Sequence, residues 1–321
     1  PLLSVLADRY GPVDVVTTPA AASLLDHHPA VADVVRYDKH GVGRGWKPFR
    51  RLGRELRAKG YDRVYLPHQS LRSALLALWS GARERIGFAD SAAAVTYTSR
   101  VARPRQGHEV ERLLALAGVR PSDAAPPVSI GLAPTDLAAA DAWLASHGIG
   151  PDFVALAPGS VWATKRWPYY AELAAGLDRT AVIVGGAEDA ELADTIVQAS
   201  GGRAVSAAGA LSLRGSAALI RRAAVLITND SAPLHLATAV GTPVVAVFGP
   251  TVPEFGFGPR RTGDIVLGHD ELRCRPCSKH GPPVCPLGHH RCMRDLSAVD
   301  VAAALARITA SEEPRAIRSW D

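Results

Sequence analysis

Apolar and polar positions alternate along this chain in blocks that predict strands and helices in turn. Short apolar runs such as Val13–Thr17, Arg63–Leu66 and Phe153–Leu156 predict buried strands. Longer segments with helical spacing lie between such runs, and the segment Ser70–Ser80 ends at Gly81. Strands that alternate with helices favour parallel sheets covered by helices on both faces. The sequence therefore predicts an α/β protein.

A second series of strands and helices begins after a proline-rich stretch, which predicts two domains. Prolines cluster between residues 119 and 134, where the strand and helix patterns lapse. A fresh doubly wound series starts at Phe153 and continues to a final helix at about 298–308. We expect a first domain over 1–135, a linker helix region over 136–150, a second domain over 151–310 and a polar tail over 311–321.

Composition and charge narrow the functional classes. No apolar run approaches the roughly 20 residues that a membrane-spanning helix needs, and no signal peptide is visible, so we expect a cytoplasmic protein. The net charge of +5 is concentrated in residues 39–63, which contain nine Lys or Arg and only two acidic residues, Glu55 and Asp62. This patch favours a phosphorylated substrate or an anionic membrane surface. The alternative is the solvated face of a helix whose apolar stripe is Phe49, Leu52 and Leu56.

Nucleic acid is disfavoured as a partner, because no aromatic side chains are interleaved with the basic ones. A nicotinamide-dependent enzyme is disfavoured as well. No Gly-x-Gly-x-x-Gly motif follows an early strand in either half of the chain.

The loop after strand Phe153–Leu156 has the residue types of a phosphate site. Gly159 permits close backbone approach, Ser160 and Thr164 offer hydroxyls, and Lys165 with Arg166 offers positive charge. The alternative is a solvated basic loop, but a position directly after a buried strand favours function.

Two further loops should reach the same edge of the sheet. The loop Gly185–Asp189 combines glycines with carboxylates that can accept hydrogen bonds from ribose hydroxyls. Glu188 and Asp189 are, however, also ordinary residues at the start of a helix. The stretch Thr228–Leu236 lies between an apolar run and a helix, where backbone N–H groups attract phosphate. Its Asp230 and Ser231 could equally be a simple N-cap.

Together these loops resemble glycosyltransferase family 9, the bacterial heptosyltransferases of lipopolysaccharide core synthesis, and most nearly its heptosyltransferase II group. The resemblance covers the whole second half and fits the first half more loosely. The matching motifs are Pro158-Gly159-Ser160, Lys165-Arg166-Trp167-Pro168, Asp230-Ser231-x-x-x-His235, Gly241-Thr242-Pro243, Phe248-Gly249-Pro250-Thr251, Tyr61-Asp62-Arg63 and His108-Glu109-Val110-Glu111-Arg112.

The resemblance implies a GT-B architecture, with two Rossmann-like domains facing a cleft. The second domain would bind the donor, ADP-heptose, and the first a lipid A–core glycolipid acceptor at the inner membrane, with peripheral membrane contact. Transfer would invert the anomeric centre without a metal, in keeping with a sequence that has no Asp-x-Asp pair. The alternatives are a non-catalytic module that binds nucleotide sugar or glycolipid, and a family 9 transferase that uses another nucleotide sugar.

Site roles follow from the same resemblance. Lys165 would neutralise the leaving diphosphate, and Asp230 would contact the sugar or orient the reacting groups; these two are the catalytic candidates. The donor-binding candidates are Gly159, Ser160, Thr164, Lys165, Asp189, Leu211, Asp230, Ser231, Ala232 and His235. Within that set Asp189 would bind ribose and Leu211 adenine. Two departures are Ala232, where the family has glycine, and Asp189, which is shorter than the family's glutamate.

The first residues of the chain resemble the inside of a helix that the family places after its first strand and a Gly-Asp loop. We therefore expect that strand, and the general-base aspartate of that loop, to lie outside this sequence, which opens on Pro1. General-base catalysis contributes about 10²–10⁴-fold, so we expect this chain to transfer sugar poorly.

All four cysteines fall in one segment, residues 274–292. Cys274, Cys277, Cys285 and Cys292 have the spacing C-x₂-C-x₇-C-x₆-C, with histidines at 280, 289 and 290 as further ligands. A first C-x₂-C pair followed by two thiols can form a structural zinc site. Reduced thiols packed in a loop, or a disulfide, are the alternatives. We expect no cofactor to be required for catalysis.

Overall fold

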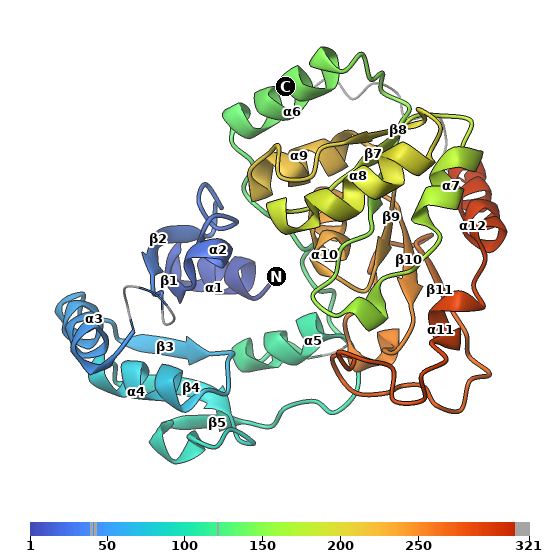
Figure 1. Cartoon of the computed structure of the whole chain (residues 1–321). Helices are drawn as coiled ribbons and strands as arrows, with labels where there is room; N and C mark the ends of the chain where they lie inside the picture. The colour runs from blue at the N-terminus through green and yellow to red at the C-terminus, as the bar shows by residue number, and fades with distance from the viewer. Residues whose placement is uncertain (39–40, 42–43, 121, 312–321) are drawn as a thin grey trace. The chain divides into compact units, whose positions relative to one another are not determined.

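The computed structural model describes residues 1–38, 41, 44–120 and 122–311. The chain divides into two compact units, Pro1–Pro127 and Val128–Asp321 (Figure 1). The helix expected as a linker is α6 (Pro134–Ser146), which belongs to the second unit and packs along α9 (Leu213–Arg222). The expected tail lies outside the described residues, apart from its first residue, which ends α12 (Ala298–Ser311).

The first unit has parallel strands in two small sheets. Strand β1 (Val13–Thr17) pairs with β2 (Val31–Arg36). The second sheet has the order β3-β4-β5, with bounds Arg63–Leu66, Glu84–Phe88 and Ser99–Val101. The remaining helices are α1 (Leu2–Tyr10), α2 (Pro19–Ala22), α4 (Leu71–Trp79) and α5 (Glu109–Leu114). All pairings are parallel, as the alternation of elements predicts.

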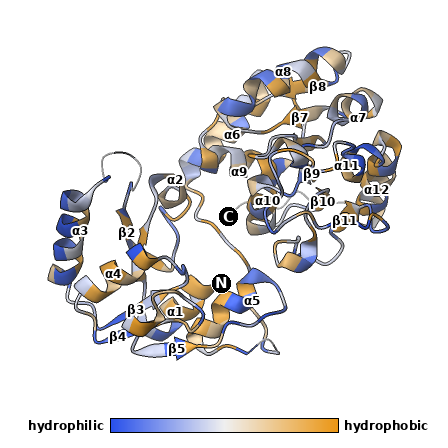
Figure 2. Ribbon diagram, turned by 60° about the horizontal axis from the view of Figure 1, so that its bottom comes forward, coloured by the Kyte–Doolittle hydropathy of each residue, from blue (hydrophilic) through white to orange (hydrophobic). Residues whose placement is uncertain are grey.

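Helix α3 (Trp46–Ala58) carries most of the basic segment. Phe49, Leu52 and Leu56 are buried on one side of this helix, whereas its arginines are exposed. Figure 2 accordingly shows much of α3 in blue. The predicted apolar stripe is confirmed; residues 39–40 and 42–43 of the segment lie outside the described residues. Within the part of the chain that the structure describes, every helix is too short or too polar to cross a membrane.

The second unit contains one parallel sheet with the strand order β11-β10-β9-β6-β7-β8. Its strands run from β6 (Val154–Ala157), β7 (Ala181–Ile183) and β8 (Ala204–Ser206) to β9 (Val225–Asn229), β10 (Val244–Phe248) and β11 (Ile265–Gly268). Strands β6, β7, β9 and β10 are fully buried along their length. Such continuous apolar runs are typical of a parallel sheet that is covered on both faces.

Helices cover both faces of this sheet (Figure 1). On one face α7 (Tyr170–Gly176), α8 (Ala190–Ala199) and α12 pack over a core that includes Leu156, Ile227 and Val247. On the other face α9 and α10 (Ala232–Val240) pack together and α10 contacts β9 and β10. Helix α10 ends at Gly241, whose φ of 77° is the left-handed conformation that glycine adopts without strain.

The sheet has a topological switch point between β6 and β9. From β6 the chain moves outward through β7 to β8, and then returns to the other side of β6 with β9 and continues to β11. The two connections leave β6 and β9 in opposite directions, which opens a crevice at the carboxyl ends of these strands. The residues that follow β6 and β9 are therefore placed to bind a ligand.

Candidate functional site

A pocket of about 960 Å³ lies at the carboxyl ends of β6, β7 and β9. The predicted donor-binding residues that line it are Gly159, Ser160, Lys165, Asp189, Leu211, Asp230, Ser231 and Ala232. Thr164 and His235 lie outside this lining. The three strand-end loops that the sequence singles out are thus brought to one pocket.

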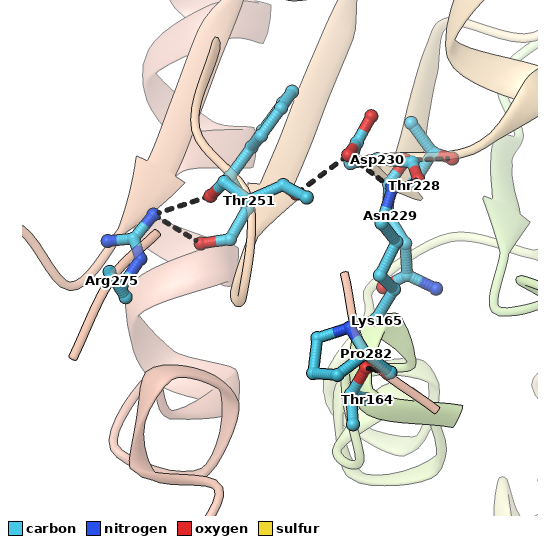
Figure 3. A network of polar contacts seen from close by, with 9 residues as sticks. Thr164, Lys165, Thr228, Asn229, Asp230, Thr251, Arg275 and Pro282 are labelled. Carbon is cyan, nitrogen blue, oxygen red and sulfur yellow. Dashed lines mark hydrogen bonds and ion pairs between the residues drawn. The ribbon is translucent and has the colours of Figure 1, made fainter. Parts of the chain in front are cut away.

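Lys165 and Asp230 form an ion pair at one end of the pocket. Lys165 Nζ lies 2.6 Å from Asp230 Oδ2, and each side chain is only 12% exposed. The Thr251 hydroxyl donates to the same carboxylate oxygen at 2.7 Å, as Figure 3 shows. Because both charges are largely withdrawn from water, their geometry is held more firmly than that of a surface pair. A cation and a carboxylate are therefore fixed side by side.

Asn229 joins the two loops that carry this pair. It is fully buried at the end of β9, its side-chain NH₂ donates to the Pro158 carbonyl at 2.8 Å, and its side-chain oxygen accepts from the Trp167 N–H at 3.1 Å. The loop after β6 is thereby attached to the end of β9, which sets the spacing between Lys165 and Asp230. Figure 3 shows Asn229 directly before Asp230.

At the other end of the pocket, Asp189 and Glu188 differ in what they contact. Asp189 Oδ2 accepts from the Gly186 N–H at 3.1 Å, and a Cβ atom at Gly159 would collide with the Asp189 carboxylate. Asp189 therefore caps its own turn. Glu188 lines the pocket, is exposed, and makes no hydrogen bond with the residues that the structure describes. Its carboxylate is therefore available to a ligand, while the ribose role of Asp189, which also lines the pocket, stays a prediction.

Ser231 lies at the N-cap of α10, between Asp230 and Ala232. Its hydroxyl oxygen is buried and has no hydrogen-bond partner in the described residues, although the residue lines the pocket. A buried hydroxyl without a partner costs about 1–3 kcal/mol. This oxygen, beside the N–H groups that open α10, is therefore suited to an anionic ligand.

Thr164 and His235 have other contacts. The Thr164 hydroxyl donates to the Pro282 carbonyl (Figure 3), so this side chain holds two loops together. The His235 ring lies edge-on to Phe257, with centroids 6.5 Å apart. The residue as a whole is exposed, but the protein atoms around the imidazole desolvate it and lower its pKa, which the Asp230 charge partly opposes.

Comparison with known proteins identifies the family. The model of glycosyltransferase family 9 (heptosyltransferase) matches residues 49–286 of this chain. The chain belongs to glycosyltransferase family 9. This transferase is 29% identical over 259 residues to the lipopolysaccharide heptosyltransferase 2 of Salmonella typhimurium, a match that covers 69% of the chain and 74% of that protein.

A second relative is the lipooligosaccharide heptosyltransferase 2 of Campylobacter jejuni, 30% identical over 170 residues. That match covers 50% of this chain and 52% of the relative, so it spans about half the length of the Campylobacter protein.

Solved structures confirm the predicted GT-B architecture of this family 9 transferase. The family 9 glycosyltransferase of Veillonella parvula superposes with a TM-score of 0.84 at 24% identity, over 97% of this chain and 92% of that one. The Escherichia coli heptosyltransferase WaaC superposes with a TM-score of 0.67 at 18% identity, over 95% and 93% of the two chains.

The cysteine segment of the transferase contains four free thiols. Burial raises the pKa of Cys277, and nearby Cys274 and Cys285 raise it further. Burial also raises the pKa of Cys292 to about 11. Within the described residues, no group of three or more His, Cys, Asp or Glu side chains is arranged to hold a metal ion. Structural zinc stays a prediction.

Several pocket residues of the transferase were missed by sequence reasoning. The sequence places Glu188 in a loop whose carboxylates can bind ribose, but the resemblance assigns that role to Asp189 alone. Asn229 could have been noticed because it is the single asparagine of the sequence and directly precedes Asp230. Thr251 and His280 reach the site through tertiary contacts, which the local sequence pattern does not predict.

Proposed function

We propose that this transferase moves heptose from ADP-heptose to the inner core of lipopolysaccharide, with inversion and without a metal. The observation that carries the proposal is the Lys165–Asp230 ion pair, 2.6 Å long, at one end of a nucleotide-sized pocket. Both relatives are named for heptose transfer to lipopolysaccharide or lipooligosaccharide. WaaC, which shares the fold, has been solved with ADP-2-deoxy-2-fluoro heptose.

The pocket suits an ADP-sugar along its length. Leu211 offers an apolar surface for adenine, and Glu188 a carboxylate for the ribose hydroxyls at the same end. The diphosphate would lie between Lys165 and the start of α10, where the Ser231 hydroxyl oxygen lacks a partner. Asp230 would then contact the transferred sugar.

The reaction derived from this arrangement is a single displacement at the anomeric carbon. An acceptor hydroxyl oxygen forms the new bond to that carbon on the side opposite the diphosphate, while the carbon–oxygen bond to ADP breaks and the hydroxyl proton is released to solvent water. Negative charge grows on the departing ADP, and the Lys165 ammonium stabilises it. A side chain that supplies this charge itself replaces the metal ion that such a step otherwise needs.

We place the acceptor on the first unit. The exposed basic face of α3 carries Arg50, Arg54 and Arg57, a surface that suits the phosphates of a lipid A–core glycolipid and of an anionic membrane. A cytoplasmic protein in peripheral contact with the inner membrane is the corresponding location.

The test is a donor screen with the purified transferase and a lipid A–core acceptor, in chelator. ADP-heptose, ADP-glucose, UDP-glucose and GDP-mannose are compared, with the product weighed by mass spectrometry and its anomeric configuration read by NMR. We expect transfer from ADP-heptose and an inverted product. Transfer from a different nucleotide sugar would overturn the donor assignment. Because this chain is expected to transfer sugar poorly, the same screen is repeated with a family Gly-Asp loop fused before Pro1. Tight binding of ADP-heptose without any transfer by that extended protein would favour a non-catalytic module.

A further inference from the structure

Residues 274–292 form a loop that is attached to the end of β10. The Arg275 guanidinium donates to the carbonyls of Phe248 at 2.9 Å, Gly249 at 2.5 Å and Thr251 at 3.1 Å. The Cys277 N–H donates to the Pro250 carbonyl at 2.8 Å. Figure 3 shows Arg275 on the side of Thr251 that faces away from Asp230. This end of the loop is therefore held by the same turn that supports Asp230.

The far end of the loop is attached to the residues around Lys165. The Thr164 hydroxyl donates to the Pro282 carbonyl, and a ring nitrogen of His290 lies 2.7 Å from the Thr164 carbonyl. Residues 278–281 thus lie between two anchored ends. The loop joins the segments that follow β6 and β10, on either side of the Lys165–Asp230 pair.

Gly281 brings this loop into direct contact with Lys165. A Cβ atom at Gly281 would lie 3.2 Å from Lys165 Cε and 3.3 Å from Pro250 Cγ, closer than side chains normally pack. Its φ of 79° is also the left-handed conformation that other residues avoid. The backbone at 281 therefore lies against the stem of Lys165, and His280 is placed next to the ammonium end of the pocket.

We propose that His280 is a binding residue for the donor, whose imidazole donates a hydrogen bond to the sugar-linked phosphate. His280 lines the pocket, is exposed, and has no hydrogen bond with any residue that the structure describes. Lys165 is already engaged by Asp230, and the Arg166 guanidinium donates to the Ser160 carbonyl. A ring N–H beside them adds a donor that no other contact uses.

The inference assigns a role to a segment that the reaction otherwise leaves unexplained. It rests on the proposed donor site, but it requires only a nucleoside diphosphate and not a particular sugar. AMP lacks the phosphate that His280 would contact, whereas ADP has it. The difference between these two nucleotides therefore isolates the contribution of the imidazole.

The experiment is calorimetric titration of ADP and AMP into the wild type and three variants. We expect His280→Ala to weaken ADP binding about tenfold, the usual effect of one lost hydrogen bond to a charged group, and to leave AMP binding unchanged. His280→Gln keeps an N–H donor and should recover part of the loss. Lys279→Ala, at an exposed neighbour outside the pocket lining, should match the wild type.

Two results would overturn the inference. Equal ADP affinity in His280→Ala and wild type shows that the ring makes no contact. Equal losses for ADP and AMP show that the substitution disturbs the loop as a whole. Failure of the proposed donor site looks different, because the wild type itself would then fail to bind ADP.

Discussion

Asn229 Oδ1 accepts the backbone N–H of Trp167 at 3.1 Å, across 62 residues of sequence. The same side chain donates to the Pro158 carbonyl, and all three residues are buried. The loop that carries Lys165 is thus fixed to the strand that leads to Asp230 by one side-chain amide.

We expect Asn229→Ala to lower the free energy of unfolding by about 3 kcal/mol, because it leaves a buried N–H and a buried carbonyl without partners. Urea denaturation measures this. Gln198→Ala removes an exposed amide from α8 and should change stability by less than about 0.5 kcal/mol. Similar losses of unfolding free energy in the two variants would show that the buried Asn229 hydrogen bonds do not stabilise the fold.

Lys165→Ala tests the role of the pocket cation. We expect kcat/KM for the donor to fall by about 10²–10³-fold, because the growing charge on the departing diphosphate loses its compensating group. Arg166→Ala removes a cation that also lines the pocket but is exposed and donates to the Ser160 carbonyl, and it should cost much less. An unchanged rate in Lys165→Ala would refute the assignment.

Glu188 and Asp189 are expected to separate binding from stability. Glu188→Ala should weaken ADP binding several-fold, since the exposed carboxylate is the proposed ribose acceptor, with little change in melting temperature. Asp189→Ala should instead lower the melting temperature, because the Gly186 N–H loses its partner, at a cost of about 1 kcal/mol. Calorimetry and thermal unfolding of both variants distinguish the roles; the opposite pattern would restore Asp189 as the ribose ligand.

His235 should make stability depend on pH. Its pKa is lowered in the folded protein, mainly by desolvation, so the unfolded chain takes up its proton first as the pH falls. Stability is then complete above the unfolded pKa of about 6.5 and is lost below it. His235→Gln should flatten this dependence between about pH 7.5 and 5, and because the residue is exposed the effect is reduced by solvent screening. Identical pH profiles for variant and wild type would contradict this.

The cysteines should differ in reactivity at pH 8. Burial opposes ionisation of Cys285, but backbone N–H groups of residues 287–290 outweigh it and lower its pKa, whereas the pKa of Cys292 rises to about 11. Iodoacetamide labelling with mass spectrometry should therefore modify Cys285 first and Cys292 last.

Metal analysis of protein purified without a chelator or a metal-affinity tag tests the zinc prediction in parallel. A metal content near one equivalent would support a structural zinc site, and the metal should then protect all four thiols from iodoacetamide. Less than about a tenth of an equivalent would reject the zinc prediction.

Regular elements could be predicted where the apolar pattern is strong. The strands Val13–Thr17 and Arg63–Leu66 agree with their predicted ranges, because burial on one or both faces leaves a clear periodicity. Strands β2, β4, β5 and β11 were not predicted. Strands β2, β4 and β5 carry charged residues such as Asp33, Glu84 and Arg100, so their pattern resembles that of a loop, and β11 is an apolar run of only four residues.

The sequence was enough to predict which loops meet at the site, but not which hydrogen bonds their side chains make. Parallel strands end at the same edge of a sheet, so the loops that follow them lie close together. Gly159, Lys165 and Asp230 could therefore be assigned to one site from the sequence. Which carboxylate caps a turn and which remains available is decided by a hydrogen bond from Gly186. The place of His280 depends on anchors more than 100 residues away, at Thr164.

Every described residue that lines the proposed donor pocket lies between Gly159 and His280, inside the unit that begins at Val128. Recognition of the nucleotide is thus encoded in one uninterrupted part of the gene. Recombination or drift upstream of that part can alter the other recognition surface while the nucleotide contacts are inherited intact. The acceptor specificity of such a transferase can therefore change during evolution while its donor binding stays the same.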